Sequence, residues 1–189
     1  MAVAVCVMAV PAASAQNSVS YFNSGVNKYK RGDLAGAITD LTKAIQLNPT
    51  YSKAYTSRGV VKSAQGDFDG AIRDHTKAIE SDPGNAGAYS NRGAAYREKG
   101  NITAALSDYS AALSIDPNDA NAYNNRGVAQ QDLGRYDAAI ADFTKAISLN
   151  PVYAEAYFNR GNCKTGKGDA AGAAKDWARA AELNPRFKR

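Results

Sequence analysis

Residues 86–119 read AGAYSNRGAAYREKGNITAALSDYSAALSIDPND, and this stretch decides the fold. Its first half carries side chains at the i, i+3, i+4, i+7 spacing of one helix face, namely Tyr89, Arg92, Gly93 and Tyr96. Gly100 then interrupts the pattern, because glycine readily takes the left-handed conformation that closes a helix. The second half carries another apolar stripe and stops before Pro117, since proline disfavours helix at the preceding residue. The stretch therefore predicts two helices joined by a tight turn.

The same pattern recurs along the chain with a period of 34 residues. Five of the six prolines keep that spacing: Pro49, Pro83, Pro117, Pro151 and Pro185. Cutting after each proline turn gives five units without linkers: 18–51, 52–85, 86–119, 120–153 and 154–187. Residues 188–189 end the chain as a basic tail. Helix pairs repeated in this way bury their apolar faces against their neighbours, so the sequence predicts a repeat array.

Residues that occupy the same position in successive repeats form a column. One such column, in the middle of the first helix, is glycine in every unit. A glycine there costs about 1 kcal/mol relative to alanine, so its repeated use predicts a close approach of two helices. The facing column of the second helix is alanine: Ala37, Ala71, Ala105, Ala139 and Ala173. Larger residues fill a column beside this contact: Leu41, His75, Tyr109, Phe143 and Trp177. We therefore expect His75, the single histidine, to be a core residue rather than a catalytic or metal-binding one.

These columns resemble the tetratricopeptide (TPR) family, in which Tyr, Gly, Tyr, Ala, an aromatic residue, Ala and Pro stand at the same offsets. The resemblance covers essentially the whole chain after the first 17 residues. It implies an all-α, right-handed solenoid of antiparallel helix pairs whose first helices line a concave groove. It also implies a scaffold that binds a partner protein or peptide.

Composition argues against several other classes of function. One histidine and two cysteines, Cys6 and Cys163, are too few for a His/Cys zinc cluster or a disulfide framework. The chain has no Gly-rich phosphate loop, and we expect no catalytic residue, no cofactor and no metal. The net charge is +5, but the basic residues are not gathered with exposed aromatic ones, so no nucleic-acid partner is expected. Cys163 falls in a column of mostly small residues and is expected to be a buried thiol.

Residues 1–15 have features of a cleavable secretory signal. Residues 1–10 are uncharged and apolar, and Ala13 and Ala15 are the small residues that a signal peptidase accepts. The apolar run is too short to span a bilayer, so no membrane insertion is expected. We predict cleavage after Ala15 and a periplasmic or secreted protein. Two alternatives stay open, an apolar tail of a cytosolic protein and a start codon upstream of Met1, since no Lys or Arg precedes the run.

Two charged columns of opposite sign run through the repeats. The second helices carry Asp40, Asp74, Asp108, Asp142 and Asp176. The first helices carry Arg58, Arg92, Arg126 and Arg160, with Ser24 in the first unit. Arg–Asp pairs that fix the register of neighbouring helices are predicted. Pairing within a unit leaves Asp40 alone and pairing to the next unit leaves Asp176 alone, and the sequence does not choose between them.

A polar column beside the arginines is the candidate peptide-binding site. It consists of Asn23, Ser57, Asn91, Asn125 and Asn159. A side-chain amide has one acceptor oxygen and two donor hydrogens, which match the C=O and N–H groups of an extended peptide. The column is similar to the asparagine ladders of some TPR superhelices. The alternative is that each amide is a packing element, hydrogen-bonded inside its own unit.

Neighbouring columns of the same groove vary in size and charge, as expected of specificity residues on a regular scaffold. The candidates there are Phe22, Lys53, Asn124 and Phe158. Thr56 and Val60 replace the Lys/Asn pair that TPR clamps for acidic chaperone tails require, so such a clamp is not expected. In the last unit alanines replace the large apolar residues of one face, so we expect the array to end there. The apolar surface that remains around Trp177 is consistent with a weak homodimer. The alternative function is an adaptor that self-associates or joins an envelope complex through its convex or terminal surfaces.

Overall fold

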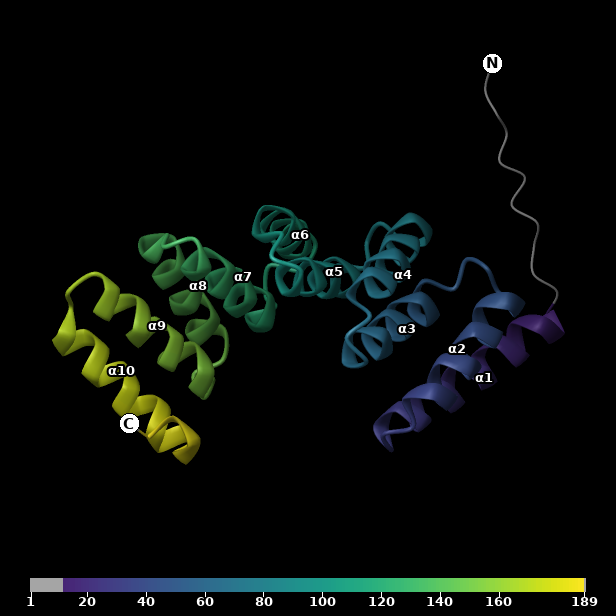
Figure 1. Ribbon diagram of the computed structural model, residues 1–189, viewed down its shortest axis with the longest axis horizontal. Helices are drawn as coiled ribbons and strands as arrows, with labels where there is room; N and C mark the ends of the chain where they lie inside the picture. The colour runs from purple at the N-terminus through teal and green to yellow at the C-terminus, as the bar shows by residue number, and fades with distance from the viewer. Residues whose placement is uncertain (1–11, 189) are drawn as a thin grey trace, which may run out of the picture. The chain divides into compact units, whose positions relative to one another are not determined.

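The computed structural model describes residues 12–188, with side chains from Gln16 onward, and all regular structure in that range is helical (Figure 1). The α-helices are α1 (Ala12–Lys30), α2 (Leu34–Leu47), α3 (Ser52–Ala64), α4 (Phe68–Ser81), α5 (Ala86–Glu98), α6 (Ile102–Ile115), α7 (Ala120–Asp132), α8 (Tyr136–Leu149), α9 (Ala154–Gly166) and α10 (Ala170–Leu183). A 3-10 turn, η1 (Pro185–Phe187), follows them. The predicted all-α repeat fold is confirmed. Residues 1–11, which hold most of the predicted signal, lie outside the described residues.

The turn inside each helix pair is closed by the predicted glycine. Gly32, Gly66, Gly100, Gly134 and Gly168 all have a positive φ, between 69° and 84°. The residue after the glycine caps the next helix in four of the five pairs, because its side chain accepts a backbone N–H three residues on. These caps are Asp33, Asp67, Asn101 and Asp169. Arg135 stands in the same position of α8 and makes no such bond.

The glycine column packs closely on the second helix. Its nearest neighbour is the large core side chain of that helix, and the facing alanine lies slightly further away. A Cβ on Gly59 would lie 2.6 Å from His75 Cε1, and one on Gly127 would lie 2.7 Å from Phe143 Cε1. The alanine carbonyl follows, at 3.2 Å in three pairs. Glycine therefore makes room for a core ring as well as for a helix backbone. His75 is fully buried in this contact, as predicted for a core residue.

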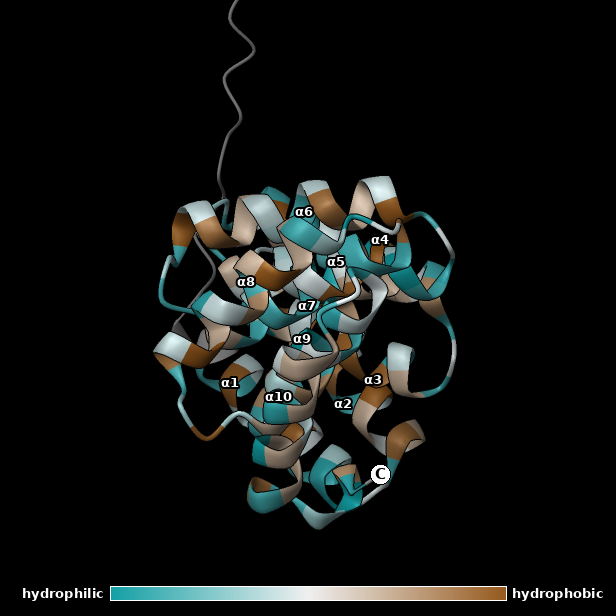
Figure 2. Ribbon diagram, turned by 90° about the vertical axis from the view of Figure 1, so that its left-hand side faces the viewer, coloured by the Kyte–Doolittle hydropathy of each residue, from teal (hydrophilic) through white to brown (hydrophobic). Residues whose placement is uncertain are grey.

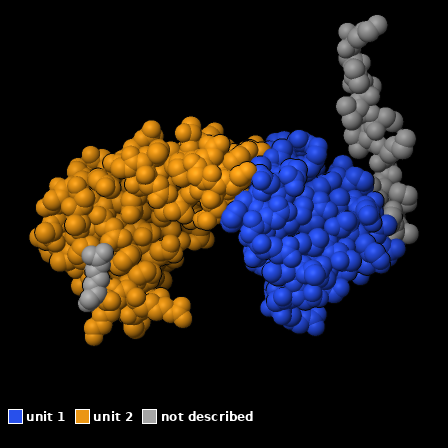
Figure 3. Space-filling view, viewed as in Figure 1, with its two compact units in different colours: residues 1–83 blue, residues 84–189 orange. Residues whose placement is uncertain are grey.

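The chain divides into two compact units, residues 1–83 and 84–189 (Figure 3). The first contains α1–α4, in which α1 packs on α2, α2 on α3 and α3 on α4. The second contains α5–α10 and η1, and consecutive helices pack in the same way. Each helix mixes hydrophilic and hydrophobic residues along its length (Figure 2), as expected of helices that bury one face.

Candidate functional site

The arginine column pairs with aspartate inside its own unit. In each of the four pairs the guanidinium donates two parallel bonds to the carboxylate, from Nε to Oδ2 at 2.8 Å and from Nη2 to Oδ1 at 2.7–2.8 Å. The pairs are Arg58–Asp74, Arg92–Asp108, Arg126–Asp142 and Arg160–Asp176. The aspartates are between 4% and 6% exposed, so these are desolvated pairs of the strong bidentate kind.

Asp40 is not alone, which corrects the expectation for pairing within a unit. Ser24 donates to its Oδ2 at 2.6 Å, and the Lys28 ammonium lies 2.7 Å from the same oxygen. Burial acts to raise the pKa of Asp40, but the hydrogen bonds and charge of Lys28, together with Ser24, hold it below its ordinary value. In the first repeat Ser24 thus stands in place of the arginine, and Lys28 supplies the cation; Lys62 and Lys164 pair with Asp74 and Asp176 in the same way, in addition to an arginine.

In Arg58, Arg126 and Arg160 the third guanidinium nitrogen reaches the preceding helix pair. Arg58 Nη1 donates to Thr42 at 3.0 Å, Arg126 Nη1 to Ser110 at 3.3 Å and Arg160 Nη1 to Thr144 at 3.1 Å. The guanidinium groups of all four arginines, Arg92 included, lie 5.5–5.7 Å from the tyrosine ring one turn before them in the helix, within cation–π range. Arg58, Arg126 and Arg160 therefore each tie the two helices of one pair to the pair before, which assigns these arginines to the scaffold.

The asparagine column is at least partly accessible. Asn23 is exposed, and Ser57, Asn91, Asn125 and Asn159 are half-buried. Among the described residues, the side-chain amides of Asn23, Asn91 and Asn125 make no hydrogen bond to protein groups. An amide that served only for packing was expected to be hydrogen-bonded inside its own unit. Asn159 differs, because its Nδ2 donates to Asn124 Oδ1 at 3.4 Å. The first three amides can therefore pair with an incoming peptide, whereas Asn159 is already engaged, though weakly.

Asn124 does not lie where a ligand could touch it. It is 1% exposed on α7 and receives the bond from Asn159 of the next helix pair. Ser90 and Phe158 stand 34 residues before and after it, at the same position of their repeats, and both are half-buried, so this position is not equally buried in every repeat. Asn124 therefore orients Asn159 rather than forming a wall of the site.

Each of the two predicted apolar side chains lies against an aromatic ring, and this ring comes from the same position later in the sequence in both cases. Phe22 lies against Tyr51, with ring centroids 5.2 Å apart, and Phe158 against Phe187, at 5.0 Å. Phe187 belongs to η1, which therefore shields part of Phe158. Lys53 is exposed near the start of α3.

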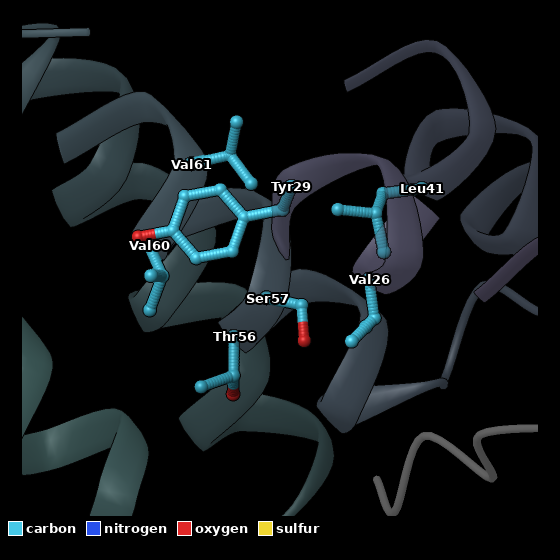
Figure 4. Close-up of a pocket in the computed structure, with 7 residues that line it drawn as sticks. All are labelled: Val26, Tyr29, Leu41, Thr56, Ser57, Val60 and Val61. Carbon is cyan, nitrogen blue, oxygen red and sulfur yellow. The ribbon is translucent and has the colours of Figure 1, made fainter. Parts of the chain in front are cut away.

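A pocket of about 140 Å³ opens between α1, α2 and α3 (Figure 4). Its lining comprises Val26, Tyr29, Leu41, Thr56, Ser57, Val60 and Val61. Figure 4 shows Tyr29 of α1 facing Val60 and Val61 of α3. Of the predicted site residues, only Ser57 contributes to it. Sequence reasoning missed the valines, although Val26 and Val60 follow Asn23 and Ser57 by three residues and so share their helix face.

Cys163 is fully buried, and its Sγ donates to Gln131 Oε1 at 3.3 Å. Burial raises the pKa of the thiol to about 11, so it stays neutral at physiological pH. Within residues 12–188 no group of three His, Cys, Asp or Glu side chains is placed to hold a metal. None of the described helices is both long and apolar enough to cross a membrane.

The chain matches models of tetratricopeptide repeats. One TPR repeat model matches residues 27–66 and 93–134, and two further tetratricopeptide models match residues 76–107 and 120–153. These matches confirm tetratricopeptide repeats within residues 27–66 and 76–153, while the division of 18–187 into five repeats stays a prediction. No curated protein matches the chain.

Several solved structures have the same fold. A MamA crystal structure is 27% identical, covers 90% of this chain and 93% of its own, and has a TM-score of 0.77. PilF of Pseudomonas aeruginosa is 20% identical over 93% of this chain and 81% of its own, with a TM-score of 0.84. YrrB, described as a TPR protein with an unusual peptide-binding site, is 21% identical over 90% of this chain and 88% of its own, with a TM-score of 0.71.

Proposed function

From the tetratricopeptide repeats that the chain contains, which are protein-interaction modules, we propose that it binds an extended peptide segment of a partner protein along the first helices of its repeats. The function is that of a non-enzymatic scaffold. The bound segment is held mainly through its backbone, because the residues that repeat in the candidate site are amides rather than charged groups.

The observation that carries this proposal is the state of Asn91 and Asn125. They occupy the same position on α5 and α7 in successive helix pairs of one compact unit. Both are half-buried, and neither amide forms a hydrogen bond with any residue that the structure describes. Partial burial restricts the rotamers of a side chain, so a half-buried amide loses less side-chain entropy than an exposed one when it pairs with a peptide group. The similarity to YrrB is one of fold and adds only that such repeats accommodate a peptide site.

An array of overlapping peptides from candidate partners tests the proposal. The protein is compared with an Asn91→Ala/Asn125→Ala variant and with Asn118→Ala, a control in the exposed turn between α6 and α7. Alanine favours helix over asparagine, so the double variant keeps its fold, which circular dichroism checks. Peptides lost with the double variant alone support the proposal.

Peptides retained equally by all three proteins would contradict it and reduce the amides to packing elements. The adaptor alternative then takes over, since an adaptor uses convex or terminal surfaces. Analytical ultracentrifugation would test it, because concentration-dependent oligomers are expected from self-association. A single monomeric species across the concentration range would remove the homodimer.

We also propose that the protein is exported and cleaved after Ala15. The support is the uncharged apolar run of residues 1–10 followed by Ala13-Ser14-Ala15. Edman sequencing of the protein recovered from the cell envelope or medium should begin at Gln16. An intact Met1 on protein found only in the cytosol would overturn export.

A further inference from the structure

The column of amides is interrupted at Ser57, and the pocket opens at that interruption. Ser57 lines the pocket on α3, whereas the equivalent residue in every other repeat is asparagine. A serine side chain has two fewer heavy atoms than asparagine, so the substitution leaves space beside Val26 and Tyr29 of α1. The site is therefore built differently in this repeat, on the face where the amides of the others lie.

The walls of the pocket select an aliphatic group. Five of the seven lining residues are valine, leucine or tyrosine. The Thr56 hydroxyl already donates to the Ser52 carbonyl at 3.1 Å, so it has little to offer a polar ligand. A buried amide or charge would lose hydration without gaining enough hydrogen bonds. A cavity of about 150 Å³ holds a benzene-sized group, so the 140 Å³ here accommodates Leu, Ile or Met and rejects Trp.

The helices on either side of the pocket are basic. Neither α1 nor α3 contains Asp or Glu. Their lysines and arginine include Lys28, Arg58 and Lys62, which are held by Asp40 or Asp74. Lys53 is exposed, and no described carboxylate lies within ion-pair distance of it. It precedes Thr56 by three residues and Ser57 by four, which puts it one helical turn from the pocket on the same face.

We propose that this pocket binds an aliphatic side chain of an extended segment and that Lys53 pairs with an Asp or Glu side chain next to it in that segment. The ligand class is thus an acidic peptide with a Leu, Ile or Met anchor. This proposal rests on the proposed function and specifies its ligand. We favour a side-chain carboxylate over the carboxylate of a chain terminus. Lys53 supplies only a single point charge, and Ser57 lacks the amide N–H donors with which an asparagine at this position could bind a terminal carboxylate.

The proposal is tested with ¹⁵N-labelled protein and the acetylated, amidated peptide GSTSELETSGSG. Amide shifts of Val26, Ser57 and Val60 should move on titration. Ser57→Asn fills the pocket with the residue found in the other repeats, so it keeps the fold, and it should weaken binding at least tenfold. Lys53→Glu should weaken binding at least fivefold, whereas the control Lys145→Glu, an equal charge change on an exposed position of α8, should not.

Two companion peptides complete the design. Replacing Leu by Ser should abolish binding, and replacing both Glu by Gln should weaken it as much as Lys53→Glu does. Equal binding of the Leu and Ser peptides, no effect of Ser57→Asn, or no binding of the Leu peptide would overturn the proposal. Tight binding of a peptide that needs a free C-terminus would replace the side-chain carboxylate by a terminal one.

The outcome is separable from that of the proposed function. A protein whose peptide binding depends on Asn91 and Asn125 but not on Ser57 or Lys53 retains the proposed function and loses this inference. A protein that depends on Ser57 and Lys53 but not on the two asparagines binds peptides through the pocket and not through the column of amides.

Discussion

Arg92 holds both carboxylate oxygens of Asp108 within one helix pair, with Nε and Nη2 each 2.8 Å from its acceptor. The aspartate is 5% exposed, so the charge depends on this guanidinium for its solvation. The hydrogen bonds to Asp108 in turn raise the pKa of Arg92. Removing one partner of such a buried ion pair lowers the free energy of unfolding strongly, whereas replacing both partners by apolar residues lowers it less.

We therefore expect Asp108→Ala to lower the free energy of unfolding by about 3 kcal/mol, since it takes the carboxylate away from a partly buried guanidinium. The double variant Arg92→Leu/Asp108→Leu should recover most of that loss. Urea unfolding followed by circular dichroism measures both. Glu80→Ala, which removes the exposed Lys77–Glu80 pair, should leave the midpoint unchanged. If the double variant is as unstable as the single one, the ion pair itself stabilises the fold, beyond neutralising two buried charges.

Acid should destabilise the protein through the same column. Burial acts to raise the pKa of Asp176, but the hydrogen bonds and charges of Arg160 and Lys164 hold it below its ordinary value of 3.8. A lowered native pKa gives stability that is present above pH 3.8 and is lost as the pH falls through the native value. Thermal melts between pH 2 and pH 6 should show Tm falling below about pH 4, and less steeply for Asp176→Asn. Equal slopes for the two proteins would contradict this assignment.

Cys163 should react slowly with thiol reagents. Its pKa of about 11 and its full burial leave little thiolate at pH 8 and no path to it. In a Cys6→Ser background, DTNB should modify Cys163 at least a hundredfold more slowly in buffer than in urea. The raised pKa also predicts stability that is intact below pH 9 and declines between pH 9 and pH 11, an effect that Cys163→Ala should remove. Rapid modification of the native protein would contradict the buried position.

The exception in the capping column offers a stabilising change. Arg135, the residue before α8, makes no side-chain capping bond, whereas Asp67 in the same position before α4 accepts from Gly70 N at 2.8 Å. Arg135→Asp should therefore raise the free energy of unfolding by about 1 kcal/mol, and Asp67→Ala should lower it by a similar amount. Thermal or urea unfolding measures both changes. A neutral Arg135→Asp would mean that the arginine stabilises α8 by other means.

The repeat pattern predicted the helices well because their ends are determined locally. Gly100 and Pro117 act through their own backbone, so sequence spacing was enough. The Arg–Asp pairing could not be chosen from spacing, because a column repeats equally toward both neighbours. Asn124 was misplaced for a related reason: a varying column indicates tolerance of different residues, not exposure. The pocket was missed because it depends on the size of Ser57 together with side chains of two other helices.

The contact of Gly59 with His75 gives the sharpest test of the core. A Cβ on Gly59 would lie 2.6–2.9 Å from three atoms of the imidazole, a rigid ring with no exposed surface into which it could move. Gly59→Ala gains about 1 kcal/mol in helix propensity, so any loss of stability measures the clash. We expect a net loss of roughly 2 kcal/mol, within the range for overpacked cores.

A double-mutant cycle identifies the ring as the cause. In a His75→Ala background the ring is absent, so Gly59→Ala should become neutral or stabilising, and the coupling between the two changes should exceed about 1 kcal/mol. Gly87→Ala, at an exposed glycine near the start of α5 with only an ordinary contact to Asn85, is the control and should be stabilising in both backgrounds. Additive effects of Gly59→Ala and His75→Ala would contradict the contact and return the glycine column to a helix–helix approach in which the large side chain takes no part.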